Sequence, residues 1–297
     1  TVASSFLIFR ANLIQVLLKQ QHVVYAFISE YKEEELSKIE ALGAIPITYE
    51  SNRGGMNPLA DAKATYALTK KIKEIAPDLV FSYFSKPVIF GTLAAKLAKV
   101  PQVIGMLEGL GYAFTEQPEG LSKKAQLIKS IQVLLYKIAL PQLDKIIFLN
   151  PDDPKDLLEA YHIKVKKLDV LGGIGLDLDE YNYQPIETID SPISFLFIGR
   201  MLKEKGIHDF IAAAKIVKQS YPDVQFTVLG AIDSSNPGAL QQSELDRLVS
   251  LNIINYPGQV DDVQKWITDS HVFVLPSYRE GVPRSTQEAM AIGRAVI

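Results

Sequence analysis

The sequence contains no cysteine and little histidine or tryptophan. Among its 297 residues there are four His, one Trp and four Met. The absence of cysteine excludes disulfides, thiolate metal sites and cysteine nucleophiles, and it is compatible with a reducing compartment. The four histidines show no spacing typical of metal ligands, so we expect them to be structural.

Long hydrophobic runs are also missing. No apolar stretch approaches the roughly 20 residues that a membrane-spanning helix needs, and no charged and then apolar signal segment opens the chain. Hydrophobic residues make up 47% of the chain and charged residues 22%, as in an ordinary globular protein. We therefore expect a cytoplasmic protein that neither spans a membrane nor is secreted.

The net charge of −3 is divided unevenly. Residues 1–150 contain 17 Lys and Arg against 13 Asp and Glu, whereas residues 151–297 contain 14 against 21. A basic half can indicate an anionic partner such as a membrane surface, although differences of this size also occur without a functional cause.

Short β-branched runs alternate with periodic apolar stretches along the whole chain. Repeated strand and helix units of this kind predict parallel, doubly wound sheets, and the length favours two domains. The pattern loosens around residues 172–192, so we predict domains at 1–178 and 179–297. A single helix predicted over Leu7–Lys19 precedes the first predicted strand, and the last predicted strand runs to the final residue. We interpret both ends of the fold as truncated.

The clearest chemical feature is a pair of carboxylates, Glu280 and Glu288, in "EGVPRSTQEAMAIGRAVI". Glu280 follows a predicted strand, where open α/β sheets bind their ligands. Glu288 is expected about one turn into the next helix, on the face toward that loop. The N–H groups around residues 284–286 would present the positive end of the helix dipole, which binds phosphate.

A second feature lies in "FIGRMLKEKG", where a predicted strand ends at Gly199 and Arg200 and Lys205 follow. Arg as a planar fork and Lys as a point charge suit a diphosphate. Either cation alone would more often be a solvated loop charge. Their occurrence together with the two carboxylates favours a ligand site.

These motifs, with the strand end at Gly230 and "YPGQVDDV" from Tyr256, resemble the donor-binding domain of family 4 retaining glycosyltransferases. The resemblance implies the GT-B fold, two Rossmann-like domains facing a cleft. It implies that Arg200 and Lys205 hold the donor diphosphate, Glu280 the sugar hydroxyls and Glu288 the ribose. The implied donor-binding set is Ser5, Gly199, Arg200, Lys205, Gly230, Val260, Glu280, Gly281, Val282, Arg284, Ser285 and Glu288.

The first half adds a narrower resemblance. The segments "SSFLIFRANLIQVLLKQQHVV", "GGMNPLADAKA", "SKPVIFGTLAAKLAKVP" and "MLEGLGYAF" resemble bacterial transferases that extend lipid-linked saccharides for capsule, O-antigen or protein glycosylation. Glu108 would face the cleft and touch the acceptor hydroxyl, or it is a turn carboxylate bonding local N–H groups. Ser5 is placed in a loop before the first helix, near the donor phosphates, where a plain helix cap explains it equally well.

Three other patterns are weaker. "GGIG" at Gly172 lacks the full dinucleotide fingerprint, so an NAD site is not expected. "DLD" at Asp177 lacks the context of a metal motif. The lysine-rich, apolar helix predicted over Ser122–Leu140 suits an anionic membrane surface, or it is a core-packed helix with extended lysines.

We therefore predict a retaining transferase that moves a hexose or N-acetylhexosamine from a UDP-sugar to a polyprenyl-diphosphate-linked saccharide. Its catalytic residues would be Glu280, Arg200, Lys205 and Glu108. It would need no cofactor or metal and would lie peripherally on the inner face of the cytoplasmic membrane. The alternatives are a GT-B-type sugar-nucleotide epimerase and a non-catalytic partner subunit of a transferase.

Overall fold

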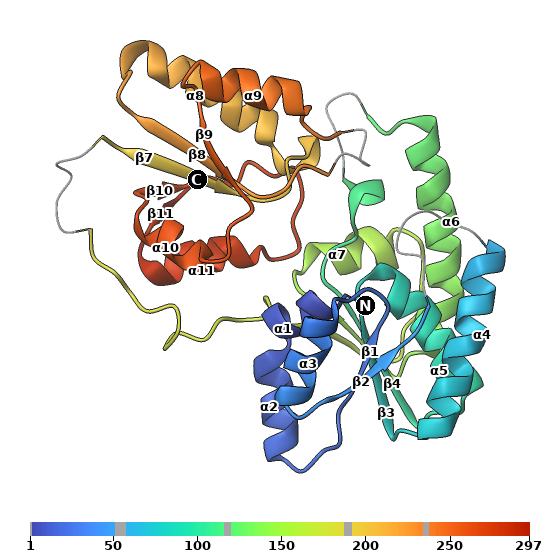
Figure 1. Cartoon of the computed structure of the whole chain (residues 1–297). Coiled ribbons are helices and arrows are strands. Elements are labelled where there is room, and N and C mark those ends of the chain that lie inside the picture. The colour runs from blue at the N-terminus through green and yellow to red at the C-terminus, as the bar shows by residue number, and fades with distance from the viewer. Residues whose placement is uncertain (1, 51–57, 116–119, 187–191, 234–237) are drawn as a thin grey trace. The chain divides into compact units, whose positions relative to one another are not determined.

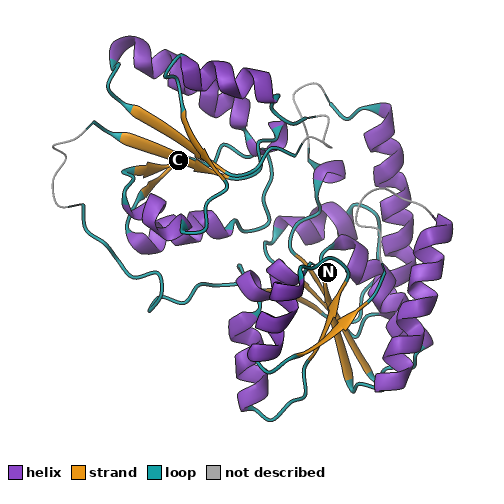
Figure 2. Ribbon diagram, in the orientation of Figure 1, coloured by secondary structure: helices purple, strands orange, loops and turns teal. Residues whose placement is uncertain are grey.

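The computed structural model describes residues 2–50, 58–115, 120–186, 192–233 and 238–297 (Figures 1 and 2). The chain divides into two compact units. The first comprises Thr1–Gly109 with Ser130–Gly172, and the second comprises Leu110–Lys129 with Gly173–Ile297. Each unit is described by itself below.

Six parallel strands form the sheets of the first unit. Strands β1 and β2 pair with each other, and the other four pair in the order β3-β4-β5-β6. Figure 1 shows α2 and α3 on one side of these strands and α4 and α5 on the other. The strands are β1 (Tyr25–Ile28), β2 (Ile45–Thr48), β3 (Leu79–Tyr83), β4 (Gln102–Leu107), β5 (Lys145–Phe148) and β6 (Leu168–Val170). The helices are α1 (Ala3–Phe9), α2 (Ala11–Lys19), α3 (Glu33–Ala41), α4 (Pro58–Ile75), α5 (Thr92–Leu97) and the short α7 (Asp152–Pro154).

The second unit has a parallel sheet of five strands in the order β11-β10-β7-β8-β9. Its strands are β7 (Ser194–Ile198), β8 (Gln225–Leu229), β9 (Asn255–Gly258), β10 (Val272–Phe273) and β11 (Ala295–Val296). Its helices are α8 (Ile207–Ser220), α9 (Gln242–Ser250), α10 (Val263–Thr268) and α11 (Arg284–Ile292). One further helix, α6 (Lys123–Ala139), begins among the residues of this unit and ends among those of the first.

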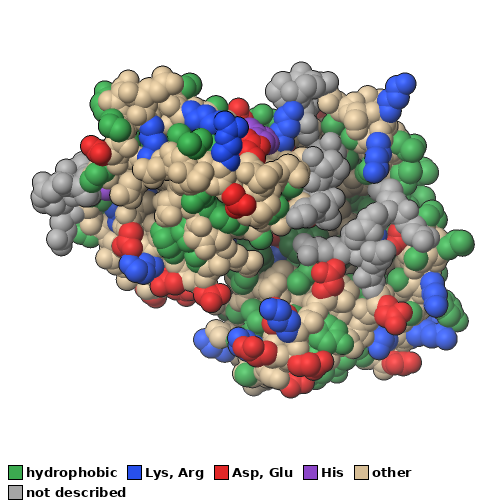
Figure 3. All heavy atoms as spheres, turned by 45° about the horizontal axis from the view of Figure 1, so that its top comes forward, with side chains coloured by type: hydrophobic (Ala, Val, Ile, Leu, Met, Phe, Trp, Pro, Cys, Tyr) green, Lys and Arg blue, Asp and Glu red, His purple; other side chains and the backbone are tan. Residues whose placement is uncertain are grey.

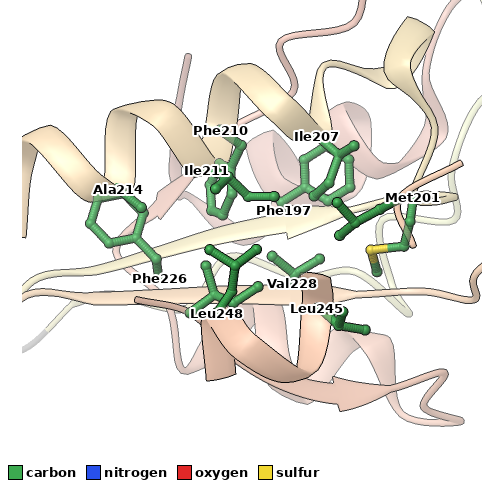
Figure 4. Close-up of a cluster of buried hydrophobic side chains, with 12 residues drawn as sticks. Phe197, Met201, Ile207, Phe210, Ile211, Ala214, Phe226, Val228, Leu245 and Leu248 are labelled. Carbon is green, nitrogen blue, oxygen red and sulfur yellow. The ribbon is translucent and has the colours of Figure 1, made fainter. Parts of the chain in front are cut away.

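Both faces of the second sheet are buried. Successive side chains of a strand point to opposite faces, so Phe197 joins one hydrophobic cluster and its neighbour Leu196 joins another. The first cluster receives Phe210 from α8 and Leu245 from α9, and is drawn in Figure 4. The second receives Ile267 and Ala289 from α10 and α11. Two apolar faces covered by helices confirm the predicted doubly wound architecture.

The start of the chain differs from the prediction. The single helix expected over Leu7–Lys19 is instead two helices, α1 and α2, which meet at Arg10. Helix α1 begins at Ala3, so Ser5 lies inside it rather than in a preceding loop. The Ser5 hydroxyl donates to the Val2 carbonyl at 2.8 Å. The apolar periodicity missed the first turn because Ala and Ser there give it no large side chains.

Among the residues that the structure describes, no helix is long and apolar enough to cross a membrane.

Candidate functional site

The carboxyl ends of β7 and β8 lie in close contact in the second unit. The N–H of Gly199 donates to the Leu229 carbonyl at 3.0 Å. Gly230 has φ +137°, and a Cβ there would overlap the Gly199 carbonyl oxygen. Both the backbone angle and the lack of space require glycine at this position. The two predicted glycines are therefore side by side, and they bring the loops after their strands together.

Lys205 and Glu280 form an ion pair at the same edge of the sheet. The Lys205 Nζ lies 2.5 Å from Glu280 Oε1, and the two side chains are 25% and 23% exposed. The backbone holds their loops together, since the Tyr278 N–H donates to the Glu204 carbonyl at 3.0 Å. Gly206, at φ +75°, could not carry a Cβ without overlapping the Pro276 carbonyl. A lysine and a carboxylate that are 75 residues apart in the sequence are thus fixed next to each other.

Arg200 points to a different partner. Its Nη1 lies 3.4 Å from Asp233 Oδ2, in the loop after β8, and its side chain is 60% exposed. The distance and the exposure make this a weak pair. Arg200 is therefore the cation of this edge that is most easily drawn to an incoming anion.

Helix α11 carries the second ion pair of the "EGVPRSTQEAM" element. The Arg284 Nε donates to Glu288 Oε1 at 2.8 Å, one helical turn along, and Glu288 is buried. No side chain caps the helix start at Pro283 and no acidic residue lies in the first turn. The positive end of the helix dipole at this start favours an anion.

The other predicted donor contacts lie around these pairs. Gly281, Val282 and Ser285 are half-buried between Glu280 and the first turn of α11. Val260 packs against the hydrophobic cluster beneath α10 and α11. The hydroxyl of Tyr256, just after the start of β9, donates to the Gly230 carbonyl at 2.9 Å. The described donor-site residues of this unit therefore lie at the carboxyl ends of its strands or at the start of α11.

Glu108 belongs to the first unit and follows β4. It forms an ion pair with Arg10, which is only 4% exposed and lies at the junction of α1 and α2. Arg10 also donates to the Phe9 carbonyl at 2.8 Å and stacks on Tyr83, with its guanidinium 4.2 Å from the ring centroid. Glu108 is thus held by a buried cation. Ser5 lies in α1 of the same unit.

The sequence interpretation missed three partner residues. Arg10 pairs with Glu108, Asp233 pairs with Arg200, and the ring of Tyr181 lies near the Arg284 guanidinium. Arg10 had a signal, because it is the one charged residue in the stretch Val2–Leu18. Asp233 had none, since its pairing with Arg200 depends on the neighbouring positions of β7 and β8 in the sheet. Part of the quoted "GGMNPLADAKA", residues 54–57, lies outside the described residues. Within the described residues there is no group of three or more His, Cys, Asp or Glu that could hold a metal.

The second unit therefore places cations and carboxylates together along one sheet edge. Arg200, Lys205 and Arg284 each face one acid, namely Asp233, Glu280 and Glu288. Such an edge can bind a diphosphate through its cations and helix start, and sugar hydroxyls through its carboxylates.

Two protein families match the chain. The family described as "Glycosyl transferase 4-like" matches residues 2–150, and the one described as "Glycosyl transferases group 1" matches residues 192–297. Residues 151–191 lie between the two matches.

Curated relatives are similar along most of the chain. The N,N'-diacetylbacillosaminyl-diphospho-undecaprenol alpha-1,3-N-acetylgalactosaminyltransferase of Campylobacter jejuni is 29% identical over 300 residues, which cover 97% of this chain and 76% of that protein. The UDP-Gal:alpha-D-GlcNAc-diphosphoundecaprenol alpha-1,3-galactosyltransferase of Escherichia coli is 25% identical, over 79% of this chain and 61% of that protein. The capsular polysaccharide biosynthesis glycosyltransferase CapM of Staphylococcus aureus is 24% identical, over 100% and 76%.

Solved structures support the fold. The crystal structure of Anabaena Alr3699/HepE in complex with UDP and glucose matches 96% of this chain and 75% of that chain with a TM-score of 0.70 at 16% identity. A glycosyltransferase structure from Rickettsia africae matches 100% and 76%, with a TM-score of 0.69 at 17% identity. At these identities the likeness concerns the fold alone, and it confirms the predicted fold class. With the family match over half of its length, the chain belongs to the glycosyl transferase 4-like family and is a glycosyltransferase.

Proposed function

We propose that this chain is a retaining transferase of family 4 that moves a hexose or N-acetylhexosamine from a UDP-sugar to a polyprenyl-diphosphate-linked saccharide. One observation carries the proposal: Lys205 and Glu280 meet at 2.5 Å on the sheet edge that also presents the start of α11. A cation for the diphosphate and a carboxylate for the sugar are thereby placed beside each other. The names of the Campylobacter and Escherichia relatives supply the acceptor class.

The chemistry we propose is a displacement on one face of the sugar. The bond from the sugar anomeric carbon to the diphosphate oxygen breaks, and the acceptor oxygen bonds to that carbon from the same side. The acceptor proton passes to an oxygen of the departing diphosphate. Arg200, Lys205 and the N–H groups near Ser285 stabilise the charge that grows on this diphosphate, which is the main source of rate enhancement.

Glu108 contributes from the first unit in this proposal. It is paired with the buried Arg10. A carboxylate held in this way is a hydrogen-bond acceptor for the saccharide hydroxyl rather than a strong base. This assignment agrees with the proton going to the diphosphate.

We propose that no metal takes part, because Arg200, Lys205 and the helix start can together neutralise the charge of a diphosphate. Transfer in excess EDTA at the same rate as in its absence would support this. A rate that falls with EDTA and returns with Mg²⁺ would contradict it.

A surface of α6 fits the proposed peripheral membrane location. Leu127, Ile131, Leu134 and Ile138 are exposed and share one face of the helix, with Leu127 61% and Leu134 58% exposed. The helix contains four lysines and no acidic residue. In the right-hand part of Figure 3, which contains α4 and α6, hydrophobic side chains lie beside Lys and Arg. Exposed apolar residues among lysines suit an anionic lipid surface.

The proposal is tested by transfer of label from a panel of radiolabelled UDP-sugars to a polyprenyl-diphosphate-linked saccharide. We expect one donor to label the lipid fraction, and Glu280→Ala to abolish this transfer. Nuclear magnetic resonance of the product then gives the configuration of the new bond. Inversion of that configuration would overturn the retaining mechanism.

Two rival functions give other outcomes. A sugar-nucleotide epimerase would convert the UDP-sugar without any acceptor, so the same panel is analysed with the acceptor left out. A non-catalytic subunit would bind UDP, detected by calorimetry, without turning over any donor of the panel.

A further inference from the structure

The segment Gly173–Gln184, which precedes the second sheet in the sequence, packs onto that sheet's helices. Gln184 donates its N–H to the Ile292 carbonyl at the end of α11, at 2.9 Å. Gln264 of α10 donates from its side chain to the Glu180 carbonyl at 2.8 Å. Tyr181 lies between Glu180 and Gln184, so the backbone on both sides of it is fixed to helices of the second unit.

Tyr181 lies against the ion pair of α11. Its ring packs on the hydrophobic cluster beneath that helix, and the Arg284 guanidinium lies 5.9 Å from the ring centroid. Burial and the charge of Glu288 raise the pKa of Tyr181, while Arg284 opposes this rise. The pKa of the Tyr181 hydroxyl is therefore affected by the charges of both Glu288 and Arg284. The three side chains form one cluster, which we call the Tyr181–Arg284–Glu288 triad.

Helix stability does not explain the arginine of this triad. Arg284 occupies the first turn of α11, where the helix dipole disfavours a cation. In the pair with Glu288 the cation precedes the acid, which is the less favourable order. Arg284 is also only 20% exposed, so it gives up much of its hydration. A cation in such an unfavourable position suggests that Arg284 has a function at the neighbouring carboxylate of Glu288.

We propose that Tyr181 and Arg284 are positioning residues that aim Glu288 at the ribose hydroxyls of the nucleotide. Arg284 holds Oε1 of Glu288, and Oε2 is then directed at the diol. Tyr181 closes the other side of the guanidinium and limits its motion. The inference rests on the proposed function, in which Glu288 contacts the ribose.

The physical reason is the burial of Glu288. The Glu288 side chain is only 11% exposed, and a buried carboxylate is costly unless a charged, hydrogen-bonded partner compensates it. Without Arg284 it would turn away from its present rotamer toward water. It would then no longer be directed at the ribose hydroxyls, and the site would lose its recognition of the ribose.

The test compares UDP with 2',3'-dideoxy-UDP by titration calorimetry on the whole chain. Hydrogen bonds from hydroxyls to a charged acceptor predict that the wild type prefers UDP by about 10- to 100-fold. We expect Arg284→Met to reduce this preference to less than about threefold, because any contribution of Arg284 to diphosphate binding lowers both affinities equally and leaves their ratio unchanged. Arg284→Lys should restore part of the preference, because it keeps the charge.

A merely structural role for Arg284 predicts something different. It would leave the preference for UDP at its wild-type value, whether or not both affinities fall together, and that result would overturn the inference. Tyr181→Leu should reduce the preference by at least about threefold, and an unchanged preference would remove Tyr181 from the triad.

Two further variants distinguish a failure of this inference from a failure of the proposed function on which it rests. Glu288→Gln tests the ribose contact itself: if it keeps the full preference, the proposed role of Glu288 fails whatever Arg284 does. Lys265→Met is the matched control, because Lys265 and Asp269 form an exposed pair with the same spacing and order on α10. It should keep the wild-type preference. A loss equal to that of Arg284→Met would overturn the inference by showing that any such helix pair has this effect.

Discussion

Glu280→Gln should separate nucleotide binding from sugar transfer. Glu280 contacts Lys205 at 2.5 Å, and both residues are about three quarters buried. The substitution keeps the size of the side chain and its ability to accept a hydrogen bond, but it removes the negative charge. Lys205 is then released from an ion pair and becomes more available to the diphosphate of UDP.

The size of this gain follows from the environment of the pair. Two unit charges 4 Å apart attract by about 4 kcal/mol at an effective dielectric constant of about 20. Side chains about a quarter exposed are partly screened by water, and exposed pairs are worth only about 0–1 kcal/mol. We therefore take about 1 kcal/mol for Glu280 and Lys205, which corresponds to roughly fivefold tighter binding of UDP.

Turnover should change in the opposite direction. If Glu280 binds the hydroxyls of the transferred sugar as the bond to the diphosphate breaks, its loss should lower kcat by about 100-fold or more, by analogy with single oxyanion donors. UDP affinity is measured by calorimetry, and kcat by label transfer to the lipid-linked acceptor. Weaker UDP binding together with an unchanged kcat would refute the roles of both Lys205 and Glu280.

Three other changes test the fold and the membrane surface. Gly230→Ala should lower the free energy of unfolding by more than about 3 kcal/mol, measured by urea denaturation, because φ is +137° and the Cβ would overlap a neighbouring carbonyl. Two lysines and an N–H group hold the pKa of Asp144 well below its usual range. Asp144→Asn should therefore cost about 1 kcal/mol at pH 7, and this cost should shrink progressively below pH about 4, where the unfolded wild-type chain takes up a proton at Asp144 while the folded protein still keeps the carboxylate charged. Leu134→Glu should reduce sedimentation with vesicles containing anionic lipid, whereas Leu251→Glu, at an equally exposed leucine of the second unit, should not.

Much of the second unit could be predicted from the sequence. Strands β7 and β8 are short, mostly apolar runs, each followed by a glycine, and β9 ends at Gly258. The carboxyl ends of parallel strands lie on one edge of their sheet, so the residues after them lie on that edge whatever their separation in the chain. This rule places Lys205 and the loop of Glu280 on the same edge, and the neighbouring positions of β7 and β10 bring them into contact.

The partners of these residues could not be predicted in the same way. The pairing of Arg200 with Asp233 rather than with Glu280 depends on the order of β7, β8 and β10 in the sheet, which the sequence pattern does not contain. Tyr181 lies in a segment without periodicity, and only its packing on α11 brings it to Arg284. Contacts made by irregular segments depend on tertiary packing, which no local pattern encodes.

The pairing of each cation with an acid has a consequence for catalysis. Unpaired cations would bind UDP tightly both before and after transfer, and this would lower the barrier little while slowing the release of product. In the proposed mechanism, Lys205 and Arg200 must instead leave Glu280 and Asp233 in part to reach a diphosphate. The diphosphate attracts Lys205 and Arg200 most strongly when its bond to the sugar breaks and the full charge collects on the leaving oxygen. The stabilisation by these two cations is therefore concentrated in the transition state. After transfer the same carboxylates compete with UDP for the cations. We therefore expect Asp233→Asn, which removes one competitor, to slow UDP release measured by stopped-flow displacement, and an unchanged release rate would contradict this account of the ion pairs.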